Sequence, residues 1–434
     1  MSMTKIKDNG SFETENNRVL VIGGGAAGMM AAIFAANGGA SVTLMERNDR
    51  CGRKLRITGK GRCNLTNDCG MEEFLTQVPS NPRFLYSALS RFSTADTKDF
   101  FESLGVPLKV ERGKRVFPVS DKAEDVVRAL QDRCLTSGVR IVRDRAKELL
   151  CHEGRICGVR GEEREYDADA VILCTGGMSY PRTGSEGDGY RLARAVGHTV
   201  TPLVPSLVPL TSSDRDCAAM QGLSLRNVAL RVTETGSGKE VYEDFGEMLF
   251  THFGMTGPMV LSASAHLRDV KPGTYTAHVN LKPALDEKTL DARLLSDFRK
   301  YSNRDFANSL SDLLPTKLIP VVIRRSGIDP RKKVNSVTRE EREALISVIT
   351  DLRFAISGFR PMSEAIVTKG GISVKEINPK TMESKVCPGL FVAGEVLDVD
   401  AYTGGFNLQI AFATGVLAGE NAAWSAVPTA NADV

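Results

Sequence analysis

Several features that assign a protein to a class at once are scarce in this sequence. Its formal net charge is only +3, and it has five histidines and nine cysteines in 434 residues. A charge so close to zero argues against a nucleic-acid-binding protein, which normally carries a clear basic excess. No C-x-x-C motif occurs and no cysteine has a metal-type spacing to a histidine, which argues against structural zinc and fits a reducing compartment. We therefore expect no metal site and no nucleic-acid partner.

Long apolar runs are also missing. The longest strongly apolar helix candidate covers residues 26–36, well below the ~20 residues that a membrane-spanning helix needs. Residues 1–17 are polar and lack the apolar core of a signal peptide, so they are predicted to be a disordered tail. These absences predict a soluble, cytoplasmic protein that does not associate with membranes.

What the sequence does contain begins with the motif G-x-G-x-x-G at Gly23, Gly25 and Gly28. The apolar run 19–22 before it predicts a buried parallel strand, and the small-residue run 29–36 after it predicts a helix. Gly23 allows the tight turn, Gly25 lets a pyrophosphate approach the backbone, and Gly28 lets the helix pack closely on the strand. A glycine-rich turn without a ligand has the same local pattern. The flanking strand and helix favour a dinucleotide site.

Two further features support this dinucleotide site. Ala26 and Ala27 begin the helix, and the free N–H groups of a helix N-terminus attract phosphate. A second predicted strand, residues 41–45, ends at Glu46. A carboxylate at this distance from the glycines accepts hydrogen bonds from a ribose hydroxyl and repels a 2′-phosphate.

A basic loop follows from residue 47 to residue 67, and its glycines argue against a helix. A solvated surface loop is the ordinary interpretation of such a run. Directly after a pyrophosphate-binding unit, a second wall of the same anionic pocket is the better one. Its basic residues are Arg47, Arg50, Arg53, Lys54, Arg56, Lys60 and Arg62.

Two other predicted strands end in glycine-containing turns. One ends at Thr175 and Gly176, and the other ends at Gly394 and Glu395, before a long small-residue helix. An NAD-dependent dehydrogenase needs only the first fingerprint, whereas an extended flavin cofactor needs all three strand ends. We therefore predict non-covalent FAD, with Glu395 on the ribityl hydroxyls and the last helix stabilising negative charge on the reduced ring. The predicted residues at the start of that helix are Gly405, Asn407 and Leu408.

The middle of the chain has a different pattern. Three prolines between positions 202 and 209 mark a linker. After it, residues 228–281 contain strand patterns, and residues 286–325 and 338–349 contain helical ones. A chain of this length exceeds one compact core. The predicted organisation is a tail at 1–17, a cofactor domain at 18–199 and 363–434, and an inserted substrate domain at 200–362.

Across about residues 18 to 422 the chain resembles the bacterial NAD(P)/FAD-dependent oxidoreductases that include a 3-dehydro-bile-acid reductase and an aminoacetone oxidase. The matching segments include Gly52-Arg-Lys54, Thr58-Gly-Lys-Gly-Arg-Cys-Asn64, Ser179-Tyr-Pro-Arg-Thr-Gly184, Thr368-Lys-Gly-Gly-Ile372 and Gly404-Gly-Phe-Asn-Leu-Gln409. The resemblance implies an α/β fold: a Rossmann-like FAD-binding domain of the glutathione-reductase type, interrupted by antiparallel strands followed by helices. It also implies FAD contacts at Ala27, Glu46, Arg47, Arg53, Gly59, Asn64, Ala146, Glu395 and Leu408.

The reaction is less determined than the cofactor. No second G-x-G-x-x-G occurs, so NAD(P)H would bind only transiently over the flavin. The favoured interpretation is NAD(P)H-driven reduction of an enone-like small molecule. The alternatives are oxidation of a small amine such as aminoacetone by O₂, and a non-catalytic FAD-dependent redox sensor. Flavin-dependent RNA modification would use the basic loop, but FAD phosphates explain that loop better.

The substrate is expected between the insert and the flavin, because binding sites favour domain interfaces. His252 lies in a glycine-rich segment of the insert and is the candidate proton donor. A hydrogen-bonded structural histidine is the alternative for this residue.

Overall fold

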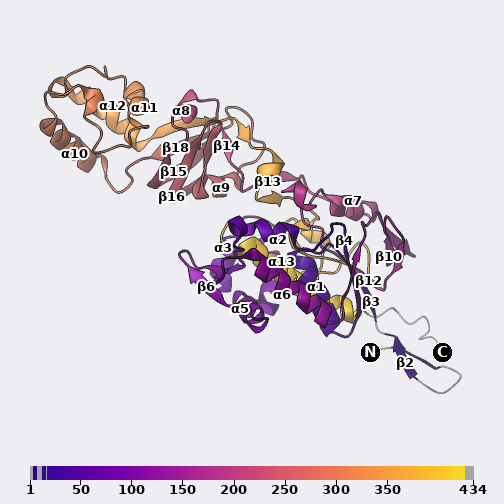
Figure 1. The fold of residues 1–434 in the computed structure, drawn as a ribbon. Helices are drawn as coiled ribbons and strands as arrows, with labels where there is room; N and C mark the ends of the chain where they lie inside the picture. Colours follow the sequence, from indigo (N-terminus) through magenta and orange to yellow (C-terminus); the bar gives the residue numbers. More distant parts are fainter. Residues whose placement is uncertain (1–2, 7–11, 16, 426–434) are drawn as a thin grey trace. The chain divides into compact units, whose positions relative to one another are not determined.

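The computed structural model describes residues 3–6, 12–15 and 17–425, with side chains from residue 17 onward (Figure 1). Contacts divide the chain into two compact units. Unit 1 comprises Met1–Ser206 and Ala365–Val434, and unit 2 comprises Leu207–Glu364. The predicted insert was residues 200–362. Its first residues instead lie in unit 1, because β13 (Val204–Ser206) pairs with β21 (Val367–Lys369) despite the prolines that predicted a linker.

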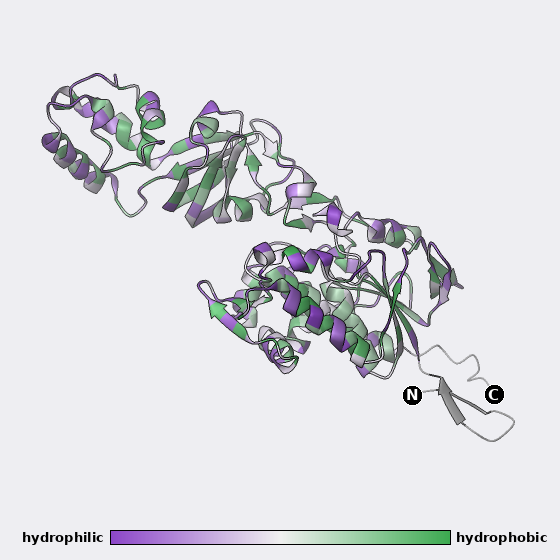
Figure 2. Cartoon of the chain, viewed as in Figure 1, coloured by the Kyte–Doolittle hydropathy of each residue, from purple (hydrophilic) through white to green (hydrophobic). Residues whose placement is uncertain are grey.

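A five-stranded parallel sheet forms the centre of unit 1. Its strands lie in the order β22-β12-β3-β4-β8. Figure 2 shows them as mostly hydrophobic, as expected of parallel strands covered on both faces. Their bounds are β3 (Arg18–Ile22), β4 (Ser41–Glu46), β8 (Arg140–Arg143), β12 (Ala170–Leu173) and β22 (Leu390–Val392).

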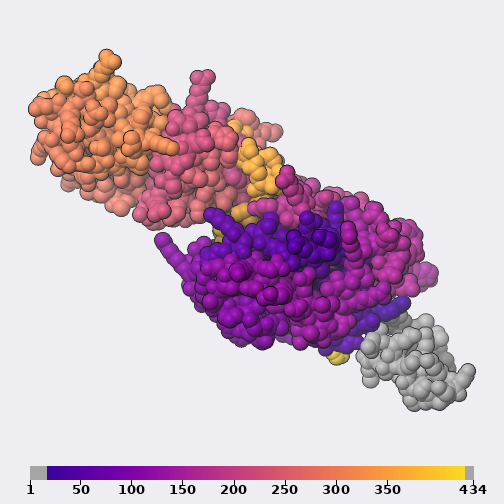
Figure 3. Space-filling view, in the orientation of Figure 1, coloured from indigo at the N-terminus to yellow at the C-terminus, as the bar shows by residue number. Residues whose placement is uncertain are grey.

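Helix α1 (Ala26–Asn37) and helix α13 (Phe406–Trp424) pack against each other and against this sheet. Their backbones approach closely through glycine. A Cβ on Gly415 would lie 2.5 Å from the Ala27 carbonyl oxygen, and one on Gly419 would lie 2.3 Å from that of Ala31. Most of α13 is buried, and other segments of unit 1 cover it almost completely in Figure 3.

The remaining elements of unit 1 surround this core. A three-stranded sheet β5-β7-β6 follows the basic loop, and an antiparallel meander β11-β10-β9 follows β8. The bounds are α2 (Arg53–Ile57), β5 (Thr66–Asn67), α3 (Met71–Thr76), α4 (Tyr86–Arg91), α5 (Thr94–Ser103), β6 (Leu108–Glu111), β7 (Arg115–Pro118), α6 (Ala123–Thr136), β9 (Glu148–His152), β10 (Arg155–Arg160), β11 (Glu165–Asp167) and α7 (Asp188–Ala195).

Unit 2 is a seven-stranded antiparallel sheet with helices, in the order β19-β18-β15-β16-β17-β14-β20. Strand β19 returns to the sheet after the helices and was not predicted. The bounds are β14 (Leu210–Thr211), α8 (Arg215–Ala219), β15 (Ser224–Glu234), β16 (Glu240–Thr251), β17 (Gly254–Thr256), α9 (Pro258–Ser264), β18 (Tyr275–Asn280), α10 (Glu287–Lys300), α11 (Ile319–Ser326), α12 (Arg339–Thr350), β19 (Leu352–Ile356) and β20 (Gly358–Phe359).

Three predictions of local structure were wrong. The basic segment 47–67, whose glycines predicted a loop, contains the short helix α2, because its five residues 53–57 lie between the glycines. The tail predicted as disordered contains an antiparallel pair, β1 (Met3–Ile6) with β2 (Phe12–Glu15); each strand has only four residues, too few for a periodic pattern in a polar segment. The rest of that tail, residues 1–2, 7–11 and 16, lies outside the described residues. The helical segment predicted over 286–325 is two helices, because Pro315 and several polar residues lie between α10 and α11.

A buried histidine joins two loops of unit 1. His198 is 4% exposed, with Nδ1 3.0 Å from Glu376 Oε2 and Nε2 2.8 Å from Ser384 Oγ. Burial lowers the pKa of His198 below its ordinary value, although the Glu376 carboxylate opposes this shift. The imidazole is therefore more readily protonated in the unfolded chain than in the folded one.

We expect the stability of unit 1 to depend on pH through His198. The unfolded chain binds a proton near pH 6.5 and the folded chain only at lower pH, so stability is fully present above about pH 6.5 and falls as pH decreases below it. His198→Gln should flatten this dependence between pH 7.5 and 5.5 in urea unfolding, whereas the exposed control His152→Gln should retain it. An equal slope in wild type and His198→Gln would contradict this role.

Candidate cofactor site

The predicted cofactor residues follow the carboxyl ends of the five parallel strands. Ile22 lies beside Leu173 in the register, Leu173 beside Val392, and Ile22 beside Met45. Parallel strands in register end at one edge of the sheet, and ligands of open α/β sheets bind at that edge. The edge therefore carries the glycine loop after β3, Glu46 and Arg47 at the end of β4, Ala146 after β8, Thr175 and Gly176 after β12, and Gly394 and Glu395 after β22.

The glycine loop has the space that a pyrophosphate requires. A Cβ on Gly28 would lie 1.8 Å from the Gly23 carbonyl oxygen, and one on Gly23 would lie 2.5 Å from that of Cys174. A Cβ on Gly25 would have nothing within 4 Å. Gly23 and Gly28 are thus required by the fold, whereas Gly25, the N-cap of α1, leaves open space at a helix N-terminus.

Glu46 is 8% exposed and is held from both sides. Its Oε2 accepts a hydrogen bond from the Gly24 N–H at 2.8 Å, and its Oε1 accepts two from Asn48, at 2.8 Å from the backbone N–H and 2.6 Å from Nδ2. Arg53 donates to Asn48 Oδ1 at 2.8 Å. The carboxylate that is predicted to bind the ribose is therefore oriented by the glycine loop and, through Asn48, by the basic loop.

Lys54 and Glu395 form an ion pair between the basic loop and the end of β22. Lys54 Nζ lies 2.6 Å from Glu395 Oε2 and 2.7 Å from Ser179 Oγ, and Ser179 donates to Glu395 Oε1 at 3.0 Å. The Thr368 N–H donates to the same Oε1 at 3.0 Å. About four-fifths of each side chain of the ion pair is buried, with 24% of Lys54 and 20% of Glu395 exposed. The predicted ribityl-binding carboxylate is thus held in a fixed orientation.

The N-terminus of α13 is tied to the basic loop. Asn67 Nδ2 donates to the Gly404 carbonyl at 3.1 Å, and Thr66 Oγ1 donates to Gln409 Oε1 at 2.7 Å. A Cβ on Gly405 would lie 2.3 Å from the Thr66 carbonyl oxygen, so this close approach requires glycine. Asn407 donates to the Ala401 carbonyl at 2.7 Å and orders the turn before the helix. Leu408 follows in its first turn.

Two buried polar atoms in this region have no partner among the described residues. They are Asn64 Oδ1 and Thr175 Oγ1, and both residues were predicted to contact the cofactor. A buried polar atom without a hydrogen bond costs about 1–3 kcal/mol. Together with the open space above Gly25, these atoms fit a bound ligand with hydroxyl and N–H groups. Gly59, close to Asn64 in the same loop, has a left-handed φ of 56°.

Of the three arginines predicted to bind the cofactor, Arg47 and Arg62 form ion pairs with carboxylates of the protein. Arg47 pairs with Glu186 at 2.8 Å and with Asp188 at 3.0 Å. Arg62 binds Glu111 and Asp121, and its guanidinium lies 4.1 Å from the centre of the Phe117 ring. The structure therefore places the Arg62 charge on the β6–β7 hairpin rather than with Glu46, Lys54 and Glu395.

We expect substitutions of Arg53 and Arg62 to affect different properties of the protein. Arg53→Gln removes the donor to Asn48 and should weaken FAD binding about tenfold, because a charge-assisted hydrogen bond contributes about 1.5–3 kcal/mol. Arg62→Gln should leave FAD affinity unchanged and lower the melting temperature instead. Flavin fluorescence titration and thermal unfolding with saturating FAD measure the two effects. Equal FAD affinity in Arg53→Gln and wild type would remove Arg53 from the site.

His252, the predicted proton donor, lies in unit 2 at the turn between β16 and β17. Its side chain is exposed, and its ring lies edge-on to Phe253 with 5.0 Å between the ring centres.

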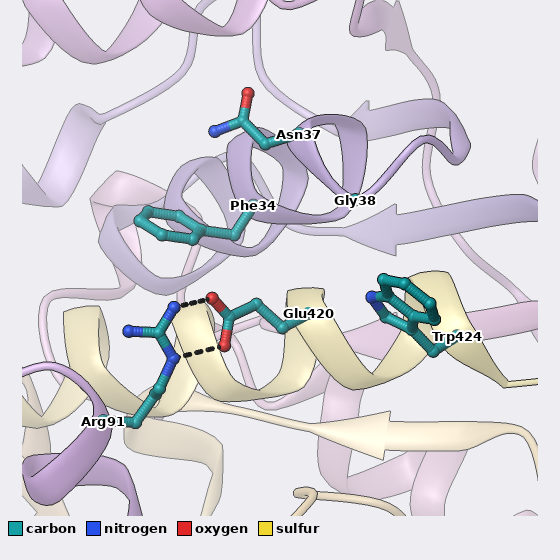
Figure 4. Close-up of a pocket in the computed structure, with 6 residues that line it drawn as sticks. All are labelled: Phe34, Asn37, Gly38, Arg91, Glu420 and Trp424. Atoms are coloured by element: carbon teal, nitrogen blue, oxygen red, sulfur yellow. Dashed lines mark hydrogen bonds and ion pairs between the residues drawn. The ribbon is translucent and has the colours of Figure 1, made fainter.

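A separate surface hollow lies between the C-terminal parts of α1 and α13 (Figure 4). It has a volume of about 390 Å³, and Arg91 forms an ion pair with Glu420 beside the exposed Trp424. None of the predicted cofactor residues lines it. The described residues contain no cluster of three or more His, Cys, Asp or Glu side chains suited to a metal ion.

The sequence reasoning missed several residues of the site. Asn48 links Glu46 to Arg53, Ser179 and Thr368 fix Glu395, and Gln409 accepts from Thr66. Ser179, Thr368 and Gln409 lie in the motifs that carry the family resemblance. The sequence therefore marked these residues, but it did not show what their side chains do. Asn48 had no signal, because its function depends on the turn that brings it back to Glu46.

Comparison with known proteins identifies the family. A model of the HI0933-like protein Rossmann domain matches residues 17–421. The chain belongs to the HI0933-like Rossmann family. Among its relatives, a 3-dehydro-bile acid delta(4,6)-reductase from Clostridium scindens is 33% identical and aligns over 94% of this chain and 99% of its own. A ribosomal RNA dihydrouridine synthase from Escherichia coli is 31% identical over 91% of this chain and 95% of its own.

The structural comparison agrees with the family assignment at the level of the fold. The 3-ketosteroid-delta4-(5alpha)-dehydrogenase of Rhodococcus jostii aligns with a TM-score of 0.51 and 17% identity, over 97% of this chain and 100% of that one. As predicted, this HI0933-like protein is a flavoprotein oxidoreductase with a Rossmann-like domain and antiparallel strands in a second unit. No helix within residues 17–425 is long and apolar enough to span a bilayer.

Proposed function

We propose that this HI0933-like protein uses FAD to transfer hydride from NAD(P)H to a carbon–carbon double bond conjugated with a carbonyl, in a small-molecule substrate. The main support for this proposal is one edge of the parallel sheet. There the open Gly25 backbone, the oriented Glu46 and the Lys54–Glu395 pair lie at the carboxyl ends of the strands. Such an edge binds an extended dinucleotide. In this proposal the flavin ring, which is the reactive part of FAD, lies near the N-terminus of α13.

The names of the relatives support the type of reaction. A delta(4,6)-reductase of a 3-dehydro-bile acid acts on double bonds conjugated with a ketone. A dihydrouridine synthase saturates the ring double bond of uridine, which is also conjugated with a carbonyl. The two names describe different substrates but the same addition of two hydrogens to an activated double bond.

The chain's own residues have separable roles in this proposal. The N–H groups at the start of α1 bind the pyrophosphate, and Glu46 accepts from ribose hydroxyls. Glu395, oriented by Lys54 and Ser179, accepts hydrogen bonds from the ribityl chain. Bound FAD supplies the hydride chemistry. The N-terminus of α13 favours negative charge near its first residues, Phe406 and Asn407.

A uridine of ribosomal RNA is the second candidate substrate, because two of the relatives, from Escherichia coli and Haemophilus influenzae, carry that name over 91% of this chain each. The small net charge of +3 favours the small molecule, since phosphate contacts dominate the affinity of proteins for nucleic acid.

Anaerobic half-reactions test the proposal. We expect NADH or NADPH to bleach the yellow protein, and a steroid 4-en-3-one to restore the absorbance of oxidised flavin. Restoration by a uridine-containing ribosomal RNA fragment but not by the enone would favour the second candidate. Bleaching by aminoacetone and not by either nicotinamide would instead identify an oxidase. A protein that takes up no FAD would overturn both reductase assignments.

A further inference from the structure

Two cysteines distant in sequence have adjacent sulfur atoms. Cys151 Sγ and Cys387 Sγ are 3.7 Å apart, and all nine cysteines of the protein are free thiols. Cys151 lies in β9 of the meander, and Cys387 lies shortly before β22 of the parallel sheet. The pair belongs entirely to unit 1 and is not among the predicted cofactor residues.

The backbone around the pair explains why the sulfurs meet. Ile156 is the partner of Cys151 in the β9–β10 ladder, and its N–H donates to the Pro388 carbonyl at 3.0 Å. On the other side, the Cys387 N–H donates to Ser384 Oγ at 2.8 Å. The Ile156–Pro388 hydrogen bond thus joins the two segments next to the cysteines, and Cys387 is held in addition by its own turn.

The two thiols differ in access to solvent. Cys151 is exposed, whereas Cys387 is 2% exposed. The exposed Cys151 is therefore the thiol that meets an oxidant from solution. Burial also raises the pKa of Cys387 to about 12, which makes its thiolate scarce. A reactive thiol in contact with a second thiol is the arrangement in which a sulfenic acid is resolved as a disulfide.

We propose that Cys151 and Cys387 are a redox-modification site that forms an intramolecular disulfide when the protein meets hydrogen peroxide. The Cys151 thiolate attacks one peroxide oxygen, the O–O bond breaks, and water leaves after protonation. The Cys387 sulfur then attacks the Cys151 sulfenic acid, its S–H proton goes to the departing hydroxide, and a second water forms. Two thiols are oxidised and one peroxide is reduced to two waters.

The sulfurs have to approach from 3.7 Å to the ~2.0 Å of a disulfide bond. The resulting bond joins the meander to the segment that leads into β22 and Glu395, and thus adds a covalent link between two parts of unit 1 that are connected by hydrogen bonds and apolar packing in the reduced protein.

Peptide mapping of the intact FAD-loaded protein tests this proposal. After treatment with hydrogen peroxide in slight excess, thiols titrated in denaturant should fall from nine to seven, and the peptides containing Cys151 and Cys387 should appear linked, two hydrogens lighter than their sum. Dithiothreitol should restore all nine. Cys151→Ser should abolish the linked peptide, as should Cys387→Ala.

Cys157 provides the matched control, because it is also exposed and lies on the neighbouring strand β10. Cys157→Ser should form the linked peptide as the wild type does. A bond between Cys151 and Cys157, further oxidation of Cys151 without any linkage, or an unchanged thiol count would each overturn the proposal. Wild type and Cys151→Ser suffice for this decision if Cys387→Ala does not fold.

Discussion

Gly25→Asp should abolish tight FAD binding and leave the apo-protein at least as stable as wild type. Gly25 is the N-cap of α1 with φ −84° and ψ −166°, an extended conformation open to any residue, and a Cβ there has nothing within 4 Å. Aspartate is a better N-cap than glycine by a few tenths of a kcal/mol. The same carboxylate occupies the space and opposes the charge of a pyrophosphate, so we expect roughly hundredfold weaker binding or worse, equivalent to the loss of one or two charge-assisted bonds.

Gly25→Asn distinguishes the effect of the negative charge on FAD binding from the effect of side-chain volume. Asparagine caps the helix equally well and has nearly the same size as aspartate, so it should weaken FAD binding less than Gly25→Asp does. Flavin titration of the apo-protein gives the affinities, and urea unfolding of the same apo-protein gives the stabilities. Tight FAD binding by Gly25→Asp would place the pyrophosphate elsewhere and remove the main support for the proposed function.

Gly419→Ala should destabilise unit 1 although alanine favours helices. In a helix interior alanine is better than glycine by about 1 kcal/mol. The new methyl group would lie 2.3 Å from the Ala31 carbonyl oxygen, a backbone atom of α1 that cannot move without shifting the whole helix. Overpacking of this kind costs about 1–3 kcal/mol and occasionally more. Taking the upper end of that range, about 3 kcal/mol, and subtracting the gain of about 1 kcal/mol from helix propensity, we expect a net loss of about 2 kcal/mol in the free energy of unfolding.

Gly70→Ser is the control for this second prediction. Gly70 is the N-cap of α3 in the same unit, has φ −74°, and has nothing within 4 Å of an added Cβ. Serine there should leave stability unchanged or raise it slightly. If Gly419→Ala unfolds at the same urea concentration as wild type, the α1–α13 contact is looser than the structure shows.

The sequence was sufficient to predict the cofactor unit because its signals are local. Gly23, Gly28 and Glu46 lie within one βαβ segment, where strand, turn and helix each have a recognisable pattern. The structure shows why these glycines are required, since a Cβ on Gly23 or Gly28 meets backbone oxygen. The later strand ends at Thr175 and Glu395 were predicted from the same strand-then-glycine pattern.

Side-chain partners across the fold were not predictable in the same way. A run of basic residues indicates an anionic pocket but does not show which arginine faces it. Arg62 pairs with Glu111 and Asp121 on a hairpin, and its partners lie far along the chain. The contact between Cys151 and Cys387 likewise depends on the register of β9 and β10 and on where Pro388 accepts its hydrogen bond.

The central sheet joins strands that lie far apart in the sequence, and this affects the order of events during synthesis. Strand β3 (Arg18–Ile22) is made well before β22 (Leu390–Val392) and α13 (Phe406–Trp424). At about 5–20 residues per second the glycine loop waits on the order of tens of seconds for them. Until then the apolar face of α1 has no α13 to cover it, and Lys54 has no Glu395. FAD can therefore be fully enclosed only after α13 has been made, and the nascent chain exposes apolar surface to chaperones in the meantime.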